Sequence, residues 1–269
     1  MDPKHTESSL TESRLTARID RFTGRAATYD RYRLRYPAAT VLDRLKAWCG
    51  LQPEWAVADI GAGTGMLSEV FLANGNPLLA IEPNPEMRAI CEQLSSRWPL
   101  LQVCNGTAEQ TGLAAGSVAV VAAGRAFHWF DIPRALLEFQ RILQPGGWLV
   151  LVSYGRAKDD SPQSMAFEDL LITHGTDYAY IRAGYRVHEN LDQVFSADHH
   201  TEKISGQQVL DWDSLLGQTQ SLSVIPKPEH PGYPAFEQQL RSFFRTYAVD
   251  GLLTVPTSCW IDAGRITTS

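Results

Sequence analysis

The sequence predicts an α/β fold in which a mostly parallel β-sheet is covered by helices on both faces. Short apolar runs alternate with segments of helical periodicity between residues 56 and 154. A glycine or a helix-capping residue separates most of these segments from the next. Hydrophobic residues make up 44% of the 269 positions and charged residues 20%, which supplies the apolar material for a sizeable core. Strands that alternate with helices indicate βαβ crossovers, and such crossovers give parallel sheets.

The residues before this alternation predict a tail, a basic segment and one helix. Residues 1–18 are polar and contain no apolar signal core, so we expect a mobile tail. Residues 22–37 are basic and aromatic. A helix should follow and end at Gly50, with one apolar stripe formed by Val41, Leu42, Leu45 and Trp48.

Five strands should form the parallel part of the sheet, at residues 56–60, 78–81, 100–104, 117–122 and 148–154. The first connecting helix begins after a glycine turn and ends at Gly75. Asn84 caps the second helix, and Pro85 occupies its first position. Asp131 caps the helix that precedes the fifth strand, and Pro145-Gly146-Gly147 ends that helix.

The alternation stops after Tyr154, and the last third of the chain is less regular. A helix is expected at about 165–174, followed by an irregular aromatic stretch. Further strands are expected at 196–205 and 252–262, with helices at 207–218 and 234–248. We therefore expect one domain over residues 19–269: a core at 38–155, an insertion and lid at about 156–195, and a C-terminal part at 196–269 that completes the sheet.

Charge and composition exclude several classes of function. The net charge of −6 argues against tight binding to bare nucleic acid, which needs a basic surface. No apolar run approaches the ~20 residues of a membrane span, so we expect no membrane partner and a cytoplasmic location. We expect no metal, because the neighbouring His199 and His200 would point in opposite directions on a strand. The scattered cysteines contain no CxxC pair and predict neither disulfides nor zinc: Cys49, Cys91, Cys104 and Cys259.

The turn VADIGAGTG, at residues 57–65, is the most informative short segment. Its glycines follow a GxGxG pattern, and the third glycine of the dinucleotide pattern GxGxxG is replaced by Met66. A Walker loop is excluded because no Gly-Lys-Ser/Thr follows. The turn therefore allows a ligand to approach the backbone but is not specialised for phosphates. A nicotinamide-dependent oxidoreductase is disfavoured by Met66 and by the absence of an evident hydride-transfer pair.

Glu82 ends the second expected strand, 21 residues after Gly61. At the carboxyl edge of an open α/β sheet, a carboxylate can accept two hydrogen bonds from a ribose diol. Hydrogen bonds to charged groups contribute roughly 1.5–3 kcal/mol each. The ligand would then contain a nucleoside, although Glu82 could instead pair with a neighbouring arginine.

Together these features resemble the class I S-adenosylmethionine-dependent methyltransferases. The turn at 57–65 resembles their first motif, and three further motifs follow in the family's order: AIEPNPEM, NGTAEQTGL and LQPGGWLVLV. The segments YDRYRLRYP and AFHWFDIPRALLEFQRIL are similar to the type 11 subgroup, which acts mainly on small molecules and includes trans-aconitate methyltransferase-like enzymes. The resemblance implies a Rossmann-like, seven-stranded, mostly parallel sheet with helices on both faces and a helical insertion after the fifth strand.

The resemblance also implies a cofactor and its site. S-adenosylmethionine would lie with its methionine part at the glycine turn, its ribose on Glu82, and its adenine between Pro83 and Met87. Arg33 could instead lie on a solvated face, and Met87 could be plain core. The cofactor-binding residues so implied are Tyr29, Arg33, Asp59, Gly61, Ala62, Gly63, Glu82, Pro83, Met87, Ala108, Glu109 and Ala123.

The acceptor site is less defined. Arg125 replaces a glutamine that is common in the subgroup, and a cation near a sulfonium is unfavourable unless it points away or meets an anionic substrate. Ala119 replaces an aspartate usual in the family, with an expected structural effect only. His128 is the candidate general base, with a packing role as the alternative. The expected substrate-pocket residues are Arg125, Phe127, Trp129, Tyr178 and Tyr185, with core packing as the alternative for Phe127 and Trp129.

The sequence therefore predicts an enzyme that methylates a small molecule and releases S-adenosylhomocysteine. A catalytically silent protein that binds the same cofactor is the alternative. Methylation of RNA is disfavoured by the acidic charge, and no recruiting module suggests methylation of a protein. The acceptor, the methylated atom and the oligomeric state are left open.

Overall fold

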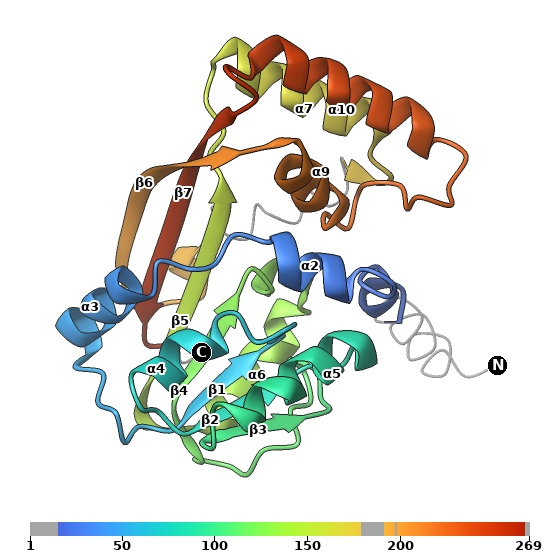
Figure 1. Ribbon diagram of the computed structural model, residues 1–269. Coiled ribbons are helices and arrows are strands. Elements are labelled where there is room, and N and C mark those ends of the chain that lie inside the picture. Colours follow the sequence, from blue (N-terminus) through green and yellow to red (C-terminus); the bar gives the residue numbers. More distant parts are fainter. Residues whose placement is uncertain (1–15, 179–190, 197, 267–269) are drawn as a thin grey trace.

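The computed structural model describes residues 16–178, 191–196 and 198–266. Its centre is a seven-stranded sheet with strand order β3-β2-β1-β4-β5-β7-β6 (Figure 1). Strands β1 to β5 run parallel, and β7 pairs antiparallel with both β5 and β6. This confirms the predicted fold class. The strands are β1 Val57–Ile60, β2 Leu78–Ile81, β3 Leu101–Cys104, β4 Val118–Gly124, β5 Leu143–Arg156, β6 His200–Leu210 and β7 Leu253–Gly264.

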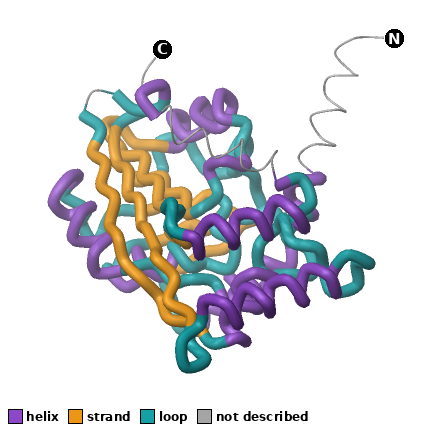
Figure 2. Tube along the Cα trace, turned by 90° about the horizontal axis from the view of Figure 1, so that it is seen from above, coloured by secondary structure: helices purple, strands orange, loops and turns teal. Residues whose placement is uncertain are grey.

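Helices cover both faces of this sheet, and Figure 2 shows them on either side of the strands. One face packs against α3, α4 and α5, and the other against α6 and residues 191–195. Asn84 Oδ1 accepts from the backbone N–H groups of Glu86 and Met87 at 3.0 Å each, as its predicted capping role requires. The helices are α2 Ala26–Tyr32, α3 Ala38–Cys49, α4 Ser68–Ala73, α5 Pro85–Gln93, α6 Ile132–Ile142, α7 Pro162–His174, α9 Trp212–Gln220 and α10 Tyr233–Tyr247, with short 3₁₀ turns η1 Leu94–Ser96, η2 Phe127–Trp129 and η4 Leu191–Gln193.

The remaining helices form a cap beyond the sheet. We call α7, α9 and α10, with the segments 221–232 and 248–252, the cap. Its apolar side chains build a separate core with the ends of β6 and β7. Strands β6 and β7 are 11 and 12 residues long. Strand β6 leads the chain from the sheet into the cap, and β7 leads it back (Figure 1).

Several boundaries differ from those that the sequence predicts. Strand β5 begins at Leu143 rather than at 148, so α6 ends at Ile142, before Pro145. The strand expected at 196–205 is observed at 200–210, because pairing with β7 continues to Leu210. Asp211 then accepts from the backbone N–H of Ser214 and starts α9, so the helix expected at 207–218 begins later. Cross-strand pairing and a side-chain cap thus decide the boundary that local periodicity could not locate.

The folded part of the chain includes residues closer to the N-terminus than the sequence predicts. Residues 16–20 are helical, and Arg18 donates to the backbone carbonyl of Trp129 at 2.8 Å. Residues 16–18, which the sequence assigns to a mobile tail, are therefore held in place by this contact. Within the described ranges, the helices are too short or too polar to cross a membrane.

Candidate active site

A small cavity of about 110 Å³ opens at the carboxyl ends of β1, β2 and β4. Strand order reverses here, since β1 pairs with β2 on one side and with β4 on the other. Ligands of open α/β sheets bind at such points. The cavity brings together eight residues that the sequence selected for cofactor binding: Tyr29, Gly61, Gly63, Glu82, Pro83, Met87, Ala108 and Glu109.

The glycine turn forms one wall of the small cavity. The N–H groups of Gly61 and Ala62 both donate to the carbonyl of Ile81, which fixes the turn against β2. Gly63 has a φ of +60° and open space where a side chain would begin. A Cβ at Gly65 would lie 2.6 Å from Leu94, so this glycine allows the close approach of α5 and η1. The close packing of α5 and η1 against the turn therefore depends on Gly65, and Met66 does not prevent it.

Glu82 is the carboxylate of the small cavity, and it is only 7% exposed. Its Oε2 accepts from the N–H of Gly63 and its Oε1 from the N–H of Asn84, both at 2.8 Å. Arg88 donates to the backbone carbonyl of Glu82 at 2.9 Å rather than to the carboxylate. Burial raises the pKa of Glu82, and the two backbone hydrogen bonds and the charge of Arg88 oppose that shift. Each carboxylate oxygen still has a lone pair for a hydroxyl donor.

Asp59 lies beneath the turn and does not line the small cavity. It is fully buried, and its Oδ2 accepts from Ser68 Oγ at 2.7 Å. Its Oδ1 is buried without a hydrogen-bond partner among the described residues. Burial raises the pKa of Asp59 to about 7, although the hydrogen bond from Ser68 lowers it. Ala62 and Ala123, also expected at the cofactor, lie outside the cavity lining.

Glu109 lines the small cavity and also holds the start of α6 through a hydrogen bond. Its Oε1 accepts from the backbone N–H of Asp131 at 2.8 Å, just before α6 begins. This contact orients the carboxylate and ties the loop after β3 to the loop after β4.

The helix α2 lies between α5 and the cap helix α9 (Figure 1), and its Tyr29 lines the small cavity. The guanidinium of Arg33 lies over the ring of Tyr29, with its carbon 5.1 Å from the ring centroid. Burial raises the pKa of Tyr29, but the nearby charges of Arg125 and Arg33 outweigh burial and lower it overall. The Nε of Arg33 is buried and has no hydrogen-bond partner among the described residues. Tyr29 lines both cavities, whereas Arg33 lines only the large one, so the predicted contact of Arg33 with the cofactor stays a prediction.

A large cavity of about 400 Å³ lies between the sheet edge and the cap. It shares four lining residues with the small cavity, so the two adjoin: Phe22, Tyr29, Arg125 and Trp129. His128 and Tyr178, both expected near the acceptor, also line it.

Two expected substrate-pocket residues are not seen in the large cavity. Phe127 is 1% exposed and lines neither cavity. Its ring packs edge-on against Phe130 at a centroid distance of 5.9 Å, so that prediction is wrong. The neighbouring positions in η2 face in different directions, which the sequence alone could not show. Tyr185 lies outside the described residues.

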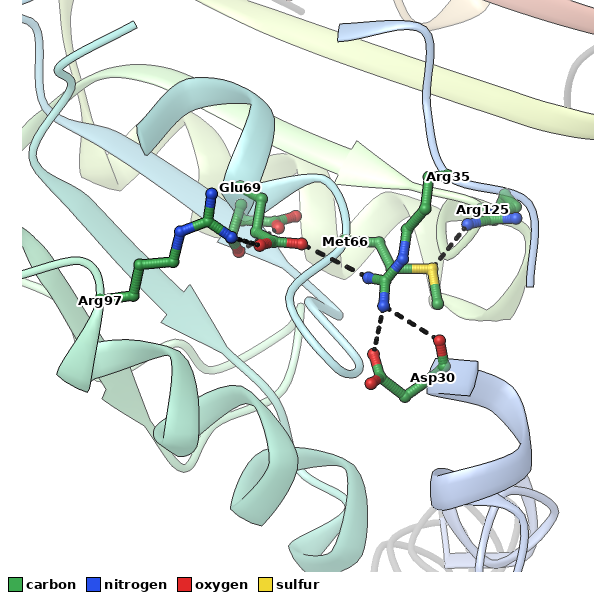
Figure 3. A network of polar contacts seen from close by, with 8 residues as sticks. Asp30, Arg35, Met66, Glu69, Arg97 and Arg125 are labelled. Atoms are coloured by element: carbon green, nitrogen blue, oxygen red, sulfur yellow. Dashed lines mark hydrogen bonds and ion pairs between the residues drawn. The ribbon is translucent and has the colours of Figure 1, made fainter. Parts of the chain in front are cut away.

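Arg125 stands where the two cavities meet. It donates to the hydroxyl of Tyr36 at 3.0 Å, the carbonyl of Tyr154 at 3.3 Å and the sulfur of Met66 at 3.2 Å. Figure 3 shows the contact with Met66 beside a separate set of ion pairs around Arg35. The acceptors of these three bonds are neutral, and burial raises the pKa of Tyr36. These contacts position the guanidinium of Arg125 at the junction of the two cavities.

Sequence reasoning missed several residues of the site, among them Arg18, Phe22 and Arg156. Arg18 lines the small cavity, Phe22 lines both cavities, and Arg156 lines the large one. The basic and aromatic character of residues 22–37 was a signal for Phe22. No local sequence pattern identifies Arg156 as a site residue, because its position in the large cavity depends on how the cap packs against β5.

Comparisons with known proteins agree with this geometry. Residues 58–151 match the family model described as "Methyltransferase domain". An uncharacterized methyltransferase of Mycobacterium tuberculosis is 35% identical over 131 residues, which are 49% of this chain and 51% of the relative. An uncharacterized methyltransferase of Schizosaccharomyces pombe is 30% identical over 127 residues, covering 47% of this chain and 49% of the relative. The chain thus spans about half the length of these relatives.

A solved structure supports the fold over a longer range. A protein of Anaeromyxobacter dehalogenans, provisionally described as a type II methyltransferase, superimposes with a TM-score of 0.61 at 23% identity. The match covers 87% of this chain and 98% of that protein. The overall fold is therefore shared with a solved structure, and identity at this level bears on the fold alone.

Proposed function

We propose that the protein methylates a small molecule. The premise is that this chain carries a class I S-adenosylmethionine-dependent methyltransferase domain. The methyl group passes from S-adenosylmethionine to the acceptor by in-line displacement, with release of S-adenosylhomocysteine. The observation that carries this proposal is the junction of two cavities at the carboxyl edge of the sheet. The small cavity offers a carboxylate for a nucleoside, and the large one has room for a separate molecule.

The residues of the small cavity suit this cofactor. Glu82 can accept from both ribose hydroxyls with its remaining lone pairs while it holds the turn. The open space at Gly63 admits the ligand close to the backbone. Pro83 and Met87 would flank the adenine, with Glu109 at its edge. The cation of Arg33 suits the carboxylate of the methionine part.

The bound sulfonium supplies an activated methyl group, so the protein has mainly to align the acceptor with it. Such alignment can supply roughly 7–11 kcal/mol of the barrier. Phe22, Tyr29 and Trp129 line both cavities and would position the two reactants against each other. A protonated acceptor would also need a base, and His128 lines the large cavity beside Trp129, with ring centroids 4.8 Å apart.

The small-molecule assignment rests on two supports. The larger cavity lies beneath the cap, among side chains of α7, α9 and α10, and not on an open surface. Residues 29–37 and 126–143 are similar to the type 11 subgroup, whose members act mainly on small molecules. A silent protein that binds the cofactor without turnover is the alternative, and methyl transfer to any acceptor excludes it.

The test is a calorimetric titration of S-adenosylmethionine into the wild-type protein and Glu82→Ala, with reduced nicotinamide dinucleotide as a control ligand. We expect micromolar binding by the wild type and at least about tenfold weaker binding by the variant, a difference of ~1.4 kcal/mol. Glu54→Ala removes an exposed carboxylate and should bind like the wild type. Circular dichroism checks that Glu82→Ala is folded, since Glu82 also holds the turn. Absence of binding by folded wild-type protein would refute the proposal.

A further inference from the structure

One wall of the small cavity comes from the N-terminal part of the described chain. We call residues 16–32 the strap; they form a short helical segment at 16–20, a turn and α2. Four residues of the strap line the small cavity, namely Arg18, Ile19, Phe22 and Tyr29. The other described lining residues belong to the ends of the strands and to the segments that connect them. The strap can therefore move without breaking the sheet.

The proposed cofactor needs more room than the small cavity provides. The cavity has a volume of about 110 Å³, whereas pockets for ligands of this size span roughly 300–1,000 Å³. The large cavity adjoins it, but Glu82 and Met87, which would hold the nucleoside, line only the small one. A nucleoside ligand can therefore enter or leave only if a wall moves, and the strap is the wall that is able to do so.

Asn84 holds the strap against the opposite wall, at the start of α5. The residue is 1% exposed. Its Nδ2 donates to the backbone carbonyl of Ile19 at 3.0 Å and to Thr23 Oγ1 at 3.1 Å. In the first turn of α5, the carboxylate of Glu86 accepts from the backbone N–H of Gly24. These three hydrogen bonds join the strap to α5 beside the small cavity.

The same asparagine organises the cofactor side of the small cavity. Its Oδ1 caps α5 by accepting from the backbone N–H groups of Glu86 and Met87, and its own backbone N–H donates to Glu82 Oε1 at 2.8 Å. The capping role needs only an acceptor, which aspartate or serine would also supply. The amide adds two donors, and both are used on the strap.

We infer that Asn84 is a positioning residue that latches the strap over the bound cofactor and slows its release. This inference rests on the proposed function and adds a contact that binding of the cofactor to Glu82 does not itself require. Opening of the strap breaks the two hydrogen bonds from Nδ2. On its other side the strap is held to the cap, because Arg25 donates to the carbonyls of Gln220 and Ile225. Loss of the latch should therefore release the strap from α5 while it stays attached to the cap.

The test measures association and release of S-adenosylhomocysteine on the immobilised full chain by surface plasmon resonance. Asn84→Asp and Asn84→Ser both keep an acceptor for the α5 cap, and both lose the amide donors. Only the aspartate adds a charge near Glu82, so an effect common to both variants comes from the lost donors. We expect both to release the ligand about tenfold faster or more, with an association rate that is unchanged or higher. Asn105→Ser alters an exposed asparagine that lines neither cavity and should behave like the wild type.

Thr23→Val provides a second variant, which leaves the α5 cap untouched. It removes one of the two acceptors of Asn84 Nδ2, so release should become about threefold faster. In the Asn84→Ser background the same change should have little further effect, because the hydrogen bond is already absent.

Cleavage by trypsin reports on the strap independently of affinity, since Arg18, Arg21 and Arg25 are cleavage sites within it. With saturating S-adenosylhomocysteine, cleavage after these residues should be at least about tenfold faster in the Asn84 variants than in the wild type. Circular dichroism checks that the variants are folded.

Three results would overturn the inference while the proposed function stands. The Asn84 variants could release S-adenosylhomocysteine at the wild-type rate, they could bind it more weakly only through slower association, or the effect could be confined to Asn84→Asp. If folded wild-type protein binds neither S-adenosylmethionine nor S-adenosylhomocysteine, the inference and the proposed function are both wrong.

Discussion

Gly217 of α9 allows the helix α2 to lie against the cap, and its replacement by alanine provides a direct test of this packing. A Cβ at position 217 would lie 2.4 to 2.6 Å from three atoms of the Tyr32 ring. Carbon atoms in contact need about 3.5–4.0 Å, so α2 and α9 would have to separate by about 1 Å. Tyr29 and Arg33 sit on or beside α2, and the shift would move both within the site.

The expected magnitude combines two opposing terms. Alanine in a helix interior is favoured over glycine by roughly 1 kcal/mol. Overpacking typically costs about 1–3 kcal/mol. We therefore expect Gly217→Ala to lower the free energy of unfolding by up to about 2 kcal/mol, which corresponds to a few degrees in melting temperature at most. Displacement of a positioning residue by 1 Å can cost up to about a hundredfold in rate, so turnover should fall more than tenfold.

The assay is a double-mutant cycle in chemical denaturation with Gly217→Ala, Tyr32→Ala and the double variant. In the Tyr32→Ala background the clash is absent, and Gly217→Ala should become stabilising by up to about 1 kcal/mol. Gly155→Ala is the control for stability, since nothing lies within 4 Å of its Cβ position. An equal effect of Gly217→Ala in both backgrounds would refute the argument from contact with Tyr32.

Three further predictions concern buried polar groups and the candidate base. Arg25 donates hydrogen bonds to the carbonyls of Gln220 and Ile225. Arg25→Met should therefore lower the free energy of unfolding, measured in urea, by about 2–4 kcal/mol. A decrease below about 0.5 kcal/mol would contradict a structural role for these bonds. The pKa of Asp59 is raised to about 7, so the unfolded chain loses this proton between about pH 4 and 7 while the folded protein keeps it. The free energy of unfolding of the wild type should therefore fall as pH rises through that window, and Asp59→Asn should flatten the fall; an unchanged pH dependence would show that the pKa is not raised. With an acceptor that carries no proton at the reacting atom, His128→Asn should lower kcat less than about tenfold and leave the pH–rate profile in place, whereas loss of an ionisation from the profile would identify His128 as a base.

The cofactor half of the site could be predicted from the sequence to a large extent. The motif at residues 57–65 and the position of Glu82 are local signals, since a strand that ends in a glycine turn places its ligand contacts within a few residues. The structure brings these positions to one cavity. It adds that Glu82 holds the turn through Gly63, which only the fold could show.

The acceptor half could be predicted only in outline. Phe127 and Trp129 are two residues apart in the same short segment, yet one is core and the other lines both cavities. Arg156 carries no local signal and reaches the large cavity because β5 extends toward the cap. The direction in which each side chain of a short 3₁₀ turn points depends on the elements that pack against the turn. The spacing of residues along the sequence does not predict it.

The sequence by itself determined the parallel sheet, the glycine turn and the class of cofactor. The sheet and the turn follow from periodicity and from capping residues, which act over a few neighbouring positions, whereas the class of cofactor is what the resemblance of the motifs to a known family implies. Only the tertiary structure decided where the acceptor cavity lies and which charges line it. That cavity joins α2, the segment after β4, the end of β5 and three helices of the cap. The last of these helices, α10, begins at Tyr233, about 200 residues after α2 ends at Tyr32. Its shape is fixed by long-range packing, such as that of Tyr32 on Gly217, and no local pattern determines such contacts.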